Sequence, residues 1–319
     1  MRIRLSPIVF NVTYLLVFVS SLSAQDLGPE FRKIKDGIYV RSASQTDPRP
    51  NANVLNSNCA IILTTDGVVL IDSGQTPTDS QAILSAVKKI TPLPVRFLIN
   101  TEIHPDHTTG HFVHSPPAII IAHEGAAEEM KKEYGFEPER IERLREESPE
   151  MREALQGYRM VTPQIEYRER LTLKLGERTF ELLYLKNVHS EADTVVWLPR
   201  ERVLFAGSGA IPNSFNRFRP FVTIPEMLDG IKRLKSLNPE IVVPGHGPPG
   251  TAKIFDDSER YYGLLLERVG KMVREGKSLD QIKQELRMPE YDHWLHKERI
   301  PENIDAAYRA VKAGYNFEH

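Results

Sequence analysis

Short apolar runs separated by turn residues predict β-strands in two parts of the chain. Cys59–Leu63 and Val68–Ile71 flank the turn Asp66-Gly67, which predicts a β-hairpin. The strand-like texture extends from Ile38 to Ile99 and is interrupted by helical spacing over Ser80–Ile90. Further strands are predicted at Val95–Ile99, Ala118–Ile121, Arg170–Leu175, Phe180–Leu185, Thr194–Leu198, Val203–Phe205 and Ile241–Val243.

Helical patterns occupy the middle and the end of the chain. Glu124–Tyr158 is rich in Glu, Lys and Arg, so we expect mostly solvated helix, with a lid over a site as the alternative. Beyond Pro248, apolar residues recur at helical spacing, Ser278 and Gln281 form a capping box, and Pro301 opens a last helix. Two strand-rich halves with helices between and after them predict an α+β fold of two packed sheets covered by helices. We expect one domain over 25–252, with 253–319 as a structural helical extension packed on it.

Composition narrows the function. The chain has 319 residues, 40% of them hydrophobic, and a formal net charge of -2, so it can bury a core and has no overall basic field for nucleic acid. Cys59 is the single cysteine, which excludes an intrachain disulfide and the Cys-rich zinc modules. Any metal must therefore be held by histidine and carboxylate.

The N-terminus has the three regions of a secretory signal peptide. Arg2 and Arg4 precede the apolar run Ile8–Val19, and small residues lead to Ala24. The run is shorter than the ~20 residues of a membrane-spanning helix, so we expect cleavage after Ala24 rather than an uncleaved anchor. The sequence thus predicts a periplasmic or secreted protein without a stable membrane span.

Candidate metal ligands follow three predicted strands. Glu102, His104, Asp106 and His107 lie directly after Val95–Ile99, and Pro105 among them argues against a helix interior and predicts a bent loop. His189 and His246 follow two other strands, and His246 stands between Gly245 and Gly247, which let backbone and metal approach closely. We expect these three loops to converge.

These motifs and their order along the chain resemble those of the metallo-β-lactamase superfamily. The pattern of that family is H-x-H-x-D-H, then a His on a second loop, then an Asp, Ser or Cys in a fourth motif, and a final G-H-G. The resemblance covers Ile38–Gly250. It implies a four-layer αββα sandwich with a cleft for one or two divalent ions, most often Zn²⁺. It places Glu102, His104 and His189 on the first metal and Asp106, His107 and His246 on the second.

The chain departs from that pattern twice. Glu102 stands where the family usually has His, and Ser208 stands where many members have a bridging Asp. This pairing resembles a minority of true metallo-β-lactamases. The number of anionic ligands is conserved, but the added carboxylate makes a bound water less acidic and widens the metal choice toward iron or manganese. A degenerate site that binds one metal or none is the alternative.

Other residues are predicted to support the site. Asp72 matches an early aspartate of the family that fixes the metal loop, although a turn-capping role fits it equally. Ser208 and His111 are expected behind the ligands. Arg217 and Arg219 are candidates to bind a substrate carboxylate or phosphate, or else are solvated. His114 fits the surface as well as the site, and a surface position is expected for His123, His293 and His296.

The resemblance implies metal-assisted hydrolysis of a small ester, lactone, thioester or amide, with Asp106 orienting the attacking water. β-Lactam hydrolysis is one alternative. Export and the Glu102/Ser208 pairing favour it, whereas the residues around His189 differ from those of lactamases with Ser at the fourth motif. A non-catalytic metal-binding accessory protein of a periplasmic oxidation system is the other alternative. The oligomeric state stays open.

Overall fold

The computed structural model describes residues 27, 31–42, 57–74, 77–132, 138–147, 149–186, 188–209 and 211–315. The predicted signal peptide lies outside these residues. In the part of the chain that is described, no helix combines the length and hydropathy needed to cross a membrane.

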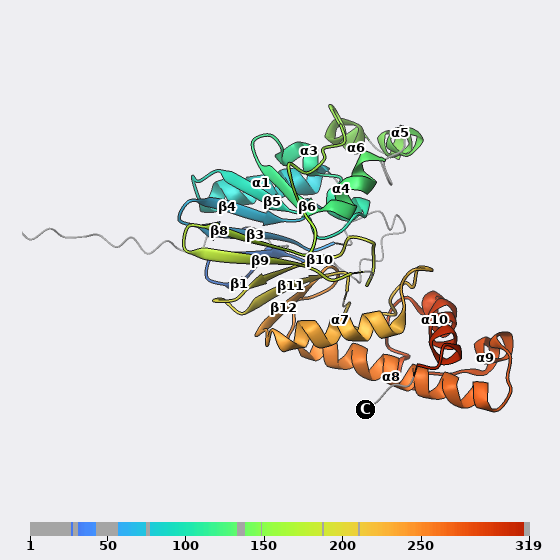
Figure 1. Cartoon of the computed structure of the whole chain (residues 1–319). Coiled ribbons are helices and arrows are strands. Elements are labelled where there is room, and N and C mark those ends of the chain that lie inside the picture. Colours follow the sequence, from blue (N-terminus) through green and yellow to red (C-terminus); the bar gives the residue numbers. More distant parts are fainter. Residues whose placement is uncertain are drawn as a thin grey trace, which may run out of the picture.

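Two β-sheets form the centre of the protein (Figure 1). The first has the strand order β1-β2-β3-β4-β5-β6-β7, antiparallel from β1 to β4 and parallel from β4 to β7. Its strands are β1 (Phe31–Lys35), β2 (Ile38–Arg41), β3 (Cys59–Thr64), β4 (Gly67–Ile71), β5 (Val95–Ile99), β6 (Ile119–His123) and β7 (Ile165–Tyr167).

The second sheet has the order β12-β11-β10-β9-β8, with one parallel pair between β11 and β12. Its strands are β8 (Arg170–Leu175), β9 (Arg178–Tyr184), β10 (Thr194–Leu198), β11 (Val203–Gly207) and β12 (Ile241–Pro244). The strands predicted from apolar runs are all present, with ends displaced by up to two residues. The strands β1 and β7 were not predicted from the sequence.

Ten α-helices are described, in three regions. They are α1 (Pro77–Ile90), α2 (Pro105–Thr108), α3 (His111–His114), α4 (Glu124–Lys131), α5 (Pro138–Glu147), α6 (Pro149–Ala154), α7 (Ile224–Ser236), α8 (Lys253–Arg274), α9 (Leu279–Glu285) and α10 (Ile300–Lys312), with 3₁₀ turns at Pro289–Tyr291 and Lys297–Arg299. The charged segment 124–158 thus contains three short helices, and the Ser278–Gln281 capping box opens α9 as predicted. The helix α7 was not predicted from the sequence.

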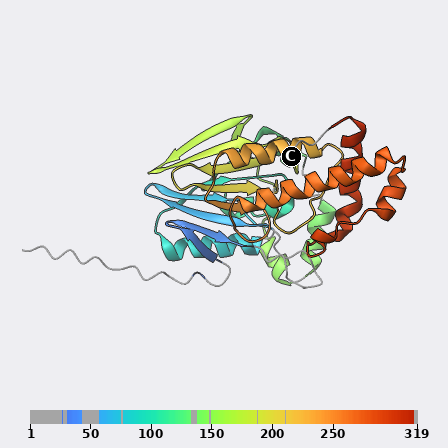
Figure 2. The same cartoon turned by 90° about the horizontal axis from the view of Figure 1, so that it is seen from below.

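Helices cover both outer faces of the sheets, which confirms the predicted α+β sandwich of four layers (Figures 1 and 2). Neighbouring residues of one strand enter different layers: Ile62 packs between the sheets, and Ile61 packs on the other face with Ile83 of α1. On the second sheet, Leu204 packs with Leu265 of α8. The strands β4, β10 and β11 read as largely apolar runs because both of their faces are buried.

Candidate metal centre

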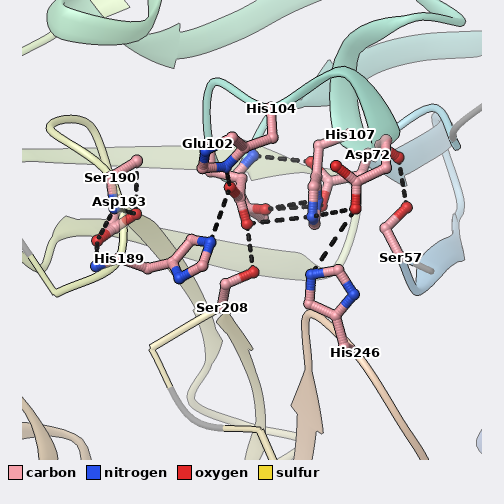
Figure 3. Close-up of polar contacts among 12 residues, drawn as sticks. Ser57, Asp72, Glu102, His104, His107, His189, Ser190, Asp193, Ser208 and His246 are labelled. Carbon is pink, nitrogen blue, oxygen red and sulfur yellow. Dashed lines mark hydrogen bonds and ion pairs between the residues drawn. The ribbon is translucent and has the colours of Figure 1, made fainter. Parts of the chain in front are cut away.

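The three candidate loops converge beyond the ends of β5, β9 and β12 (Figure 3). Parallel pairing of β4 with β5, and of β11 with β12, brings the ends of these strands to the same edge of each sheet. The ligand-bearing loops of both sheets therefore face one another at one edge of the sandwich.

The first loop is partly helical, which corrects the prediction of a bent loop. Asp106 and His107 lie on the one-turn helix α2, whose first residue is Pro105. Proline is tolerated at this position because its missing N–H would have no partner within the helix. Glu102 and His104 precede the helix, and the backbone of His104 is extended.

Glu102 lies at the middle of the cluster and is 1% exposed. Its carboxylate contacts His104 Nδ1, accepts a hydrogen bond from Ser208 Oγ, and lies 3.1 Å from His107 Nε2 and 3.8 Å from His189 Nε2. Burial alone would raise the pKa of Glu102. The positive charges that His107, His104 and His189 can carry outweigh it and hold the pKa well below its usual value.

The ligand atoms form two groups that share Glu102. One group contains Glu102, His104 and His189, and the other contains Glu102, His107 and His246, with the ligand atoms of each group within 4.8 Å of one another. Asp106, the carboxylate expected on the second metal, lies beside the second group. Its Oδ2 is 3.5 Å from His107 Nε2 and 3.7 Å from His246 Nε2.

Asp72 holds the second group from behind. Its carboxylate accepts hydrogen bonds from the Thr101 backbone N–H at 2.8 Å and hydroxyl at 2.6 Å, and it lies 2.7 Å from His107 Nδ1. Nε2 of His107 is thereby turned toward Glu102, as in ligand histidines whose second nitrogen is fixed by a carboxylate. Burial lowers the pKa of His107, but Glu102, Asp72 and Asp106 together raise it well above its usual value.

Asp193 fixes the loop that carries His189, a role that was not predicted from the sequence. Its carboxylate accepts hydrogen bonds from the backbone N–H groups of Val188, His189 and Ser190 and from the Ser190 hydroxyl. Burial, followed by the charge of Glu102, raises the pKa of Asp193 to about 7. The signal in the sequence was only its place four residues after His189.

Asn58 and Ser57 hold the other loops and were also missed. The Asn58 side-chain amide donates to the carbonyls of Pro244 and Gly247, both at 2.7 Å, and Ser57 Oγ donates to the backbone carbonyl of Asp106. Gly245 is required here because a Cβ would lie 2.8 Å from Ser208 Oγ and 2.8 Å from the carbonyl carbon of Gly207. A larger residue would displace the His246 loop.

The remaining histidines lie partly where they were not expected. His111 and His114 on α3 are both 1% exposed, and burial is the main cause that lowers their pKa values, to about 4 and about 3. The surface position expected for His123 is wrong. It is buried, accepts a hydrogen bond from Gly125 N–H, and stacks on Tyr184 at 3.9 Å between ring centroids. His293 and His296 are exposed as predicted.

The two candidate arginines differ. Arg217 is exposed, whereas Arg219 reaches the cluster. Its Nη1 donates to the His189 carbonyl at 2.9 Å, and its Nη2 lies 2.6 Å from His104 Nε2.

The donor set fits a divalent cation. Imidazole nitrogens and carboxylate oxygens are ligands of zinc, and the second nitrogen of a ligand histidine is commonly held by a carboxylate. Here imidazole nitrogens of His107 and His189 are turned toward a buried carboxylate, and Asp72 holds the other nitrogen of His107. A cation between them would offset the cost of burying Glu102.

Known proteins resemble this chain in sequence. The family model of the metallo-beta-lactamase superfamily matches residues 52–246. Metallo-beta-lactamase type 2 of Bacillus sp. (strain 170) is 27% identical over 209 residues, which are 63% of this chain and 70% of that protein.

Solved structures share the fold. A metallo-beta-lactamase from Pontibacter korlensis matches with a TM-score of 0.56 and 20% identity over 72% of this chain and 96% of its own. The stereoselective inverting sec-alkylsulfatase Pisa1 from Pseudomonas sp. matches with a TM-score of 0.67 and 18% identity over 89% of this chain and 50% of its own. The chain belongs to the metallo-beta-lactamase superfamily.

Proposed function

We propose that this protein is an exported metal-dependent hydrolase of small esters, lactones, thioesters or amides. The observation that carries the proposal is the convergence of two histidine pairs on the buried carboxylate of Glu102. His104 and His189 would hold one divalent ion, and His107, His246 and the adjacent Asp106 would hold a second, with Glu102 contributing to both. Zinc suits this donor set best, and the carboxylate also admits iron or manganese.

A bound divalent ion would lower the pKa of a water molecule and polarise the scissile carbonyl. The residues of the chain would orient the reacting groups. Asp72 fixes the ring of His107, and Asp193 fixes the loop of His189. Asp106 is 19% exposed, and its Oδ2 would accept the proton that the attacking water loses.

Sulfate ester hydrolysis is a second candidate. The match to the sec-alkylsulfatase covers 89% of the chain, which is longer than residues 1–252 and must include part of the C-terminal helices. The match to the β-lactamase structure covers 72%. This difference favours alkyl sulfates over β-lactams as the next class to assay, although β-lactam hydrolysis stays in the test.

The proposal is tested by elemental analysis of protein purified without added metal, followed by assays with 4-nitrophenyl acetate, a lactone, a thioester, nitrocefin and an alkyl sulfate. We expect one or two equivalents of metal and hydrolysis of at least one substrate, both lost after chelation. Bound metal without hydrolysis of any substrate would favour the non-catalytic accessory role and contradict the proposal.

Export is proposed from Arg2, the apolar run Ile8–Val19 and Ala24. The mature chain is expected to begin at Gln25. Intact-mass analysis of a periplasmic extract tests this, and a mass that retains residues 1–24 would indicate an anchor instead.

A further inference from the structure

Residues 213–219 form a loop that connects the C-terminal helices to the candidate metal centre. Arg219 at the end of this loop donates from Nη1 to the His189 carbonyl at 2.9 Å, and its Nη2 lies 2.6 Å from His104 Nε2. The guanidinium group therefore contacts both histidines of the His104–His189 group. Figure 1 shows that α10 lies beyond the ends of the strands rather than across the face of the sheet.

Two aromatic side chains anchor this loop on α8. The Phe215 ring packs edge-on against Tyr261 at 5.4 Å between ring centroids, and the Phe218 ring packs edge-on against Tyr262 at 5.7 Å. Both phenylalanines are buried. Phe218 directly precedes Arg219, so the backbone that carries the guanidinium group is held against the C-terminal helices.

Asn303 on α10 holds the loop between these two rings. It is fully buried, and its Nδ2 donates to the carbonyls of Asn216 and Arg299, both at 2.8 Å. Its Oδ1 accepts a hydrogen bond from the Tyr261 hydroxyl at 3.1 Å. Arg299 adds a hydrogen bond from Nη1 to the Phe215 carbonyl at 3.1 Å. Both N–H groups and the oxygen of the Asn303 amide are thus paired, which fixes its orientation and the position of the loop.

We propose that Asn303 is a positioning residue of the metal centre, which acts through the loop 213–219 and Arg219 on the His104–His189 group. Without its amide, the loop would lose a buried hydrogen bond, and Arg219 would no longer be held against the His189 carbonyl. Asn303 lies beyond residues 52–246, which match the family model, so the C-terminal helices take part in metal binding. This inference rests on the proposed metal centre but does not require hydrolysis.

Asn58 provides a matched comparison in the other group. It is also buried, and its side-chain amide donates to the carbonyls of Pro244 and Gly247, on either side of the His246 loop. Replacement by alanine therefore removes one buried amide beside each group. If Asn303 only supports the fold, its loss should affect both groups alike. If it positions Arg219, the two replacements should weaken different groups.

Co²⁺ binding measures each group without turnover, because the visible absorption of cobalt depends on the geometry of its ligands. The metal-free full chain is titrated with Co²⁺ against a competing chelator in the wild type, Asn303→Ala and Asn58→Ala. His189→Ala and His246→Ala assign each equivalent of cobalt to a group. Arg299→Gln removes a second hydrogen bond to the same loop at a half-buried side chain, which covers the case in which Asn303→Ala does not fold.

We expect Asn303→Ala to weaken the equivalent of the His104–His189 group about tenfold, to change its absorption, and to leave the other equivalent unchanged. Asn58→Ala should do the reverse, and Arg299→Gln should weaken the same equivalent as Asn303→Ala to a smaller extent. Weakening of both equivalents or of neither by Asn303→Ala and Arg299→Gln would overturn the proposal, as would a wild type that binds no Co²⁺ in the His104–His189 group. Cobalt binding without hydrolysis of any substrate would contradict the proposed hydrolase but not this inference.

Discussion

The two histidine groups share Glu102 but differ in the charged residues that surround them. His107 lies among three carboxylates, and these raise its pKa well above the usual value despite complete burial. His189 lies near Arg219 as well as Glu102, and burial lowers its pKa well below the usual value. Surroundings that stabilise positive charge on His107 also favour a divalent cation there. We therefore expect the His107–His246 group to bind metal more tightly than the His104–His189 group.

The largest effect is expected from His246→Ala. It removes a ligand of the tighter group, so we expect loss of about one metal equivalent and a fall in kcat/KM of about 100-fold or more. His293→Ala, at an exposed histidine, is the control. Unchanged metal content in His246→Ala would remove this residue from the centre.

Asp72→Asn tests the carboxylate behind His107. The change keeps the size of the side chain but removes the charge that orients the ring, so the affinity of the second group should fall about 10- to 100-fold. Titration with Co²⁺ in the presence of a chelator would measure it, with the exposed Asp66→Asn as the control. If the first group weakened instead, the comparison of the two groups would be wrong.

The buried side chain of His114 makes the stability of the fold depend on pH. Burial lowers the pKa of His114 from 6.5 to about 3, so the unfolded chain takes up this proton more readily than the folded protein. The contribution to stability is complete above pH 6.5 and is lost as the pH falls toward the folded pKa. Between pH 7 and pH 5 we expect a loss of about 2 kcal/mol from this side chain. Urea unfolding at both pH values should show a smaller loss for His114→Asn, and an identical loss would contradict the assignment.

Asp193→Asn should give the smallest effect, in the weaker group. Asparagine retains one of the two acceptor oxygens that hold residues 188–190, so metal affinity of the His104–His189 group should fall about tenfold. The same chelator titration measures it. An effect on the tighter group of equal size would show that the two groups are not separable.

Much of the fold could be predicted from the sequence because most strands are buried on both faces and read as unbroken apolar runs. β1 escaped prediction because Arg32 and Lys33 are exposed and interrupt its apolar pattern. α7 escaped because Pro225 and Gly230 resemble loop residues. Pro225 lies in the first turn of the helix, after the N-cap Thr223. Gly230 packs so close to Val188 that a Cβ at this position would lie 3.1 Å from Val188 Cγ2.

In the candidate centre, the metal ligands could be predicted from the sequence, whereas the residues that hold their loops could not. Its ligand types and their order along the chain pointed to a metal, because few other functions need this spacing of His, Asp and Glu. Asn58 and Asp193 could not be assigned, since their role depends on which loops meet in space. Arg299 lies 80 residues beyond Arg219 in a segment expected to be structural, and nothing local to it indicated that it reaches the same loop.

Metal stoichiometry of Glu102→Gln tests the central claim most directly, because the two groups are proposed to share this carboxylate. Equilibrium dialysis followed by elemental analysis would compare the wild type with Glu102→Gln and with Asp106→Asn. If both groups use Glu102, Glu102→Gln should weaken both equivalents, whereas Asp106→Asn should weaken only the tighter one. Loss of a single equivalent in Glu102→Gln, with the other bound as in the wild type, would contradict the shared carboxylate and assign Glu102 to the first group alone.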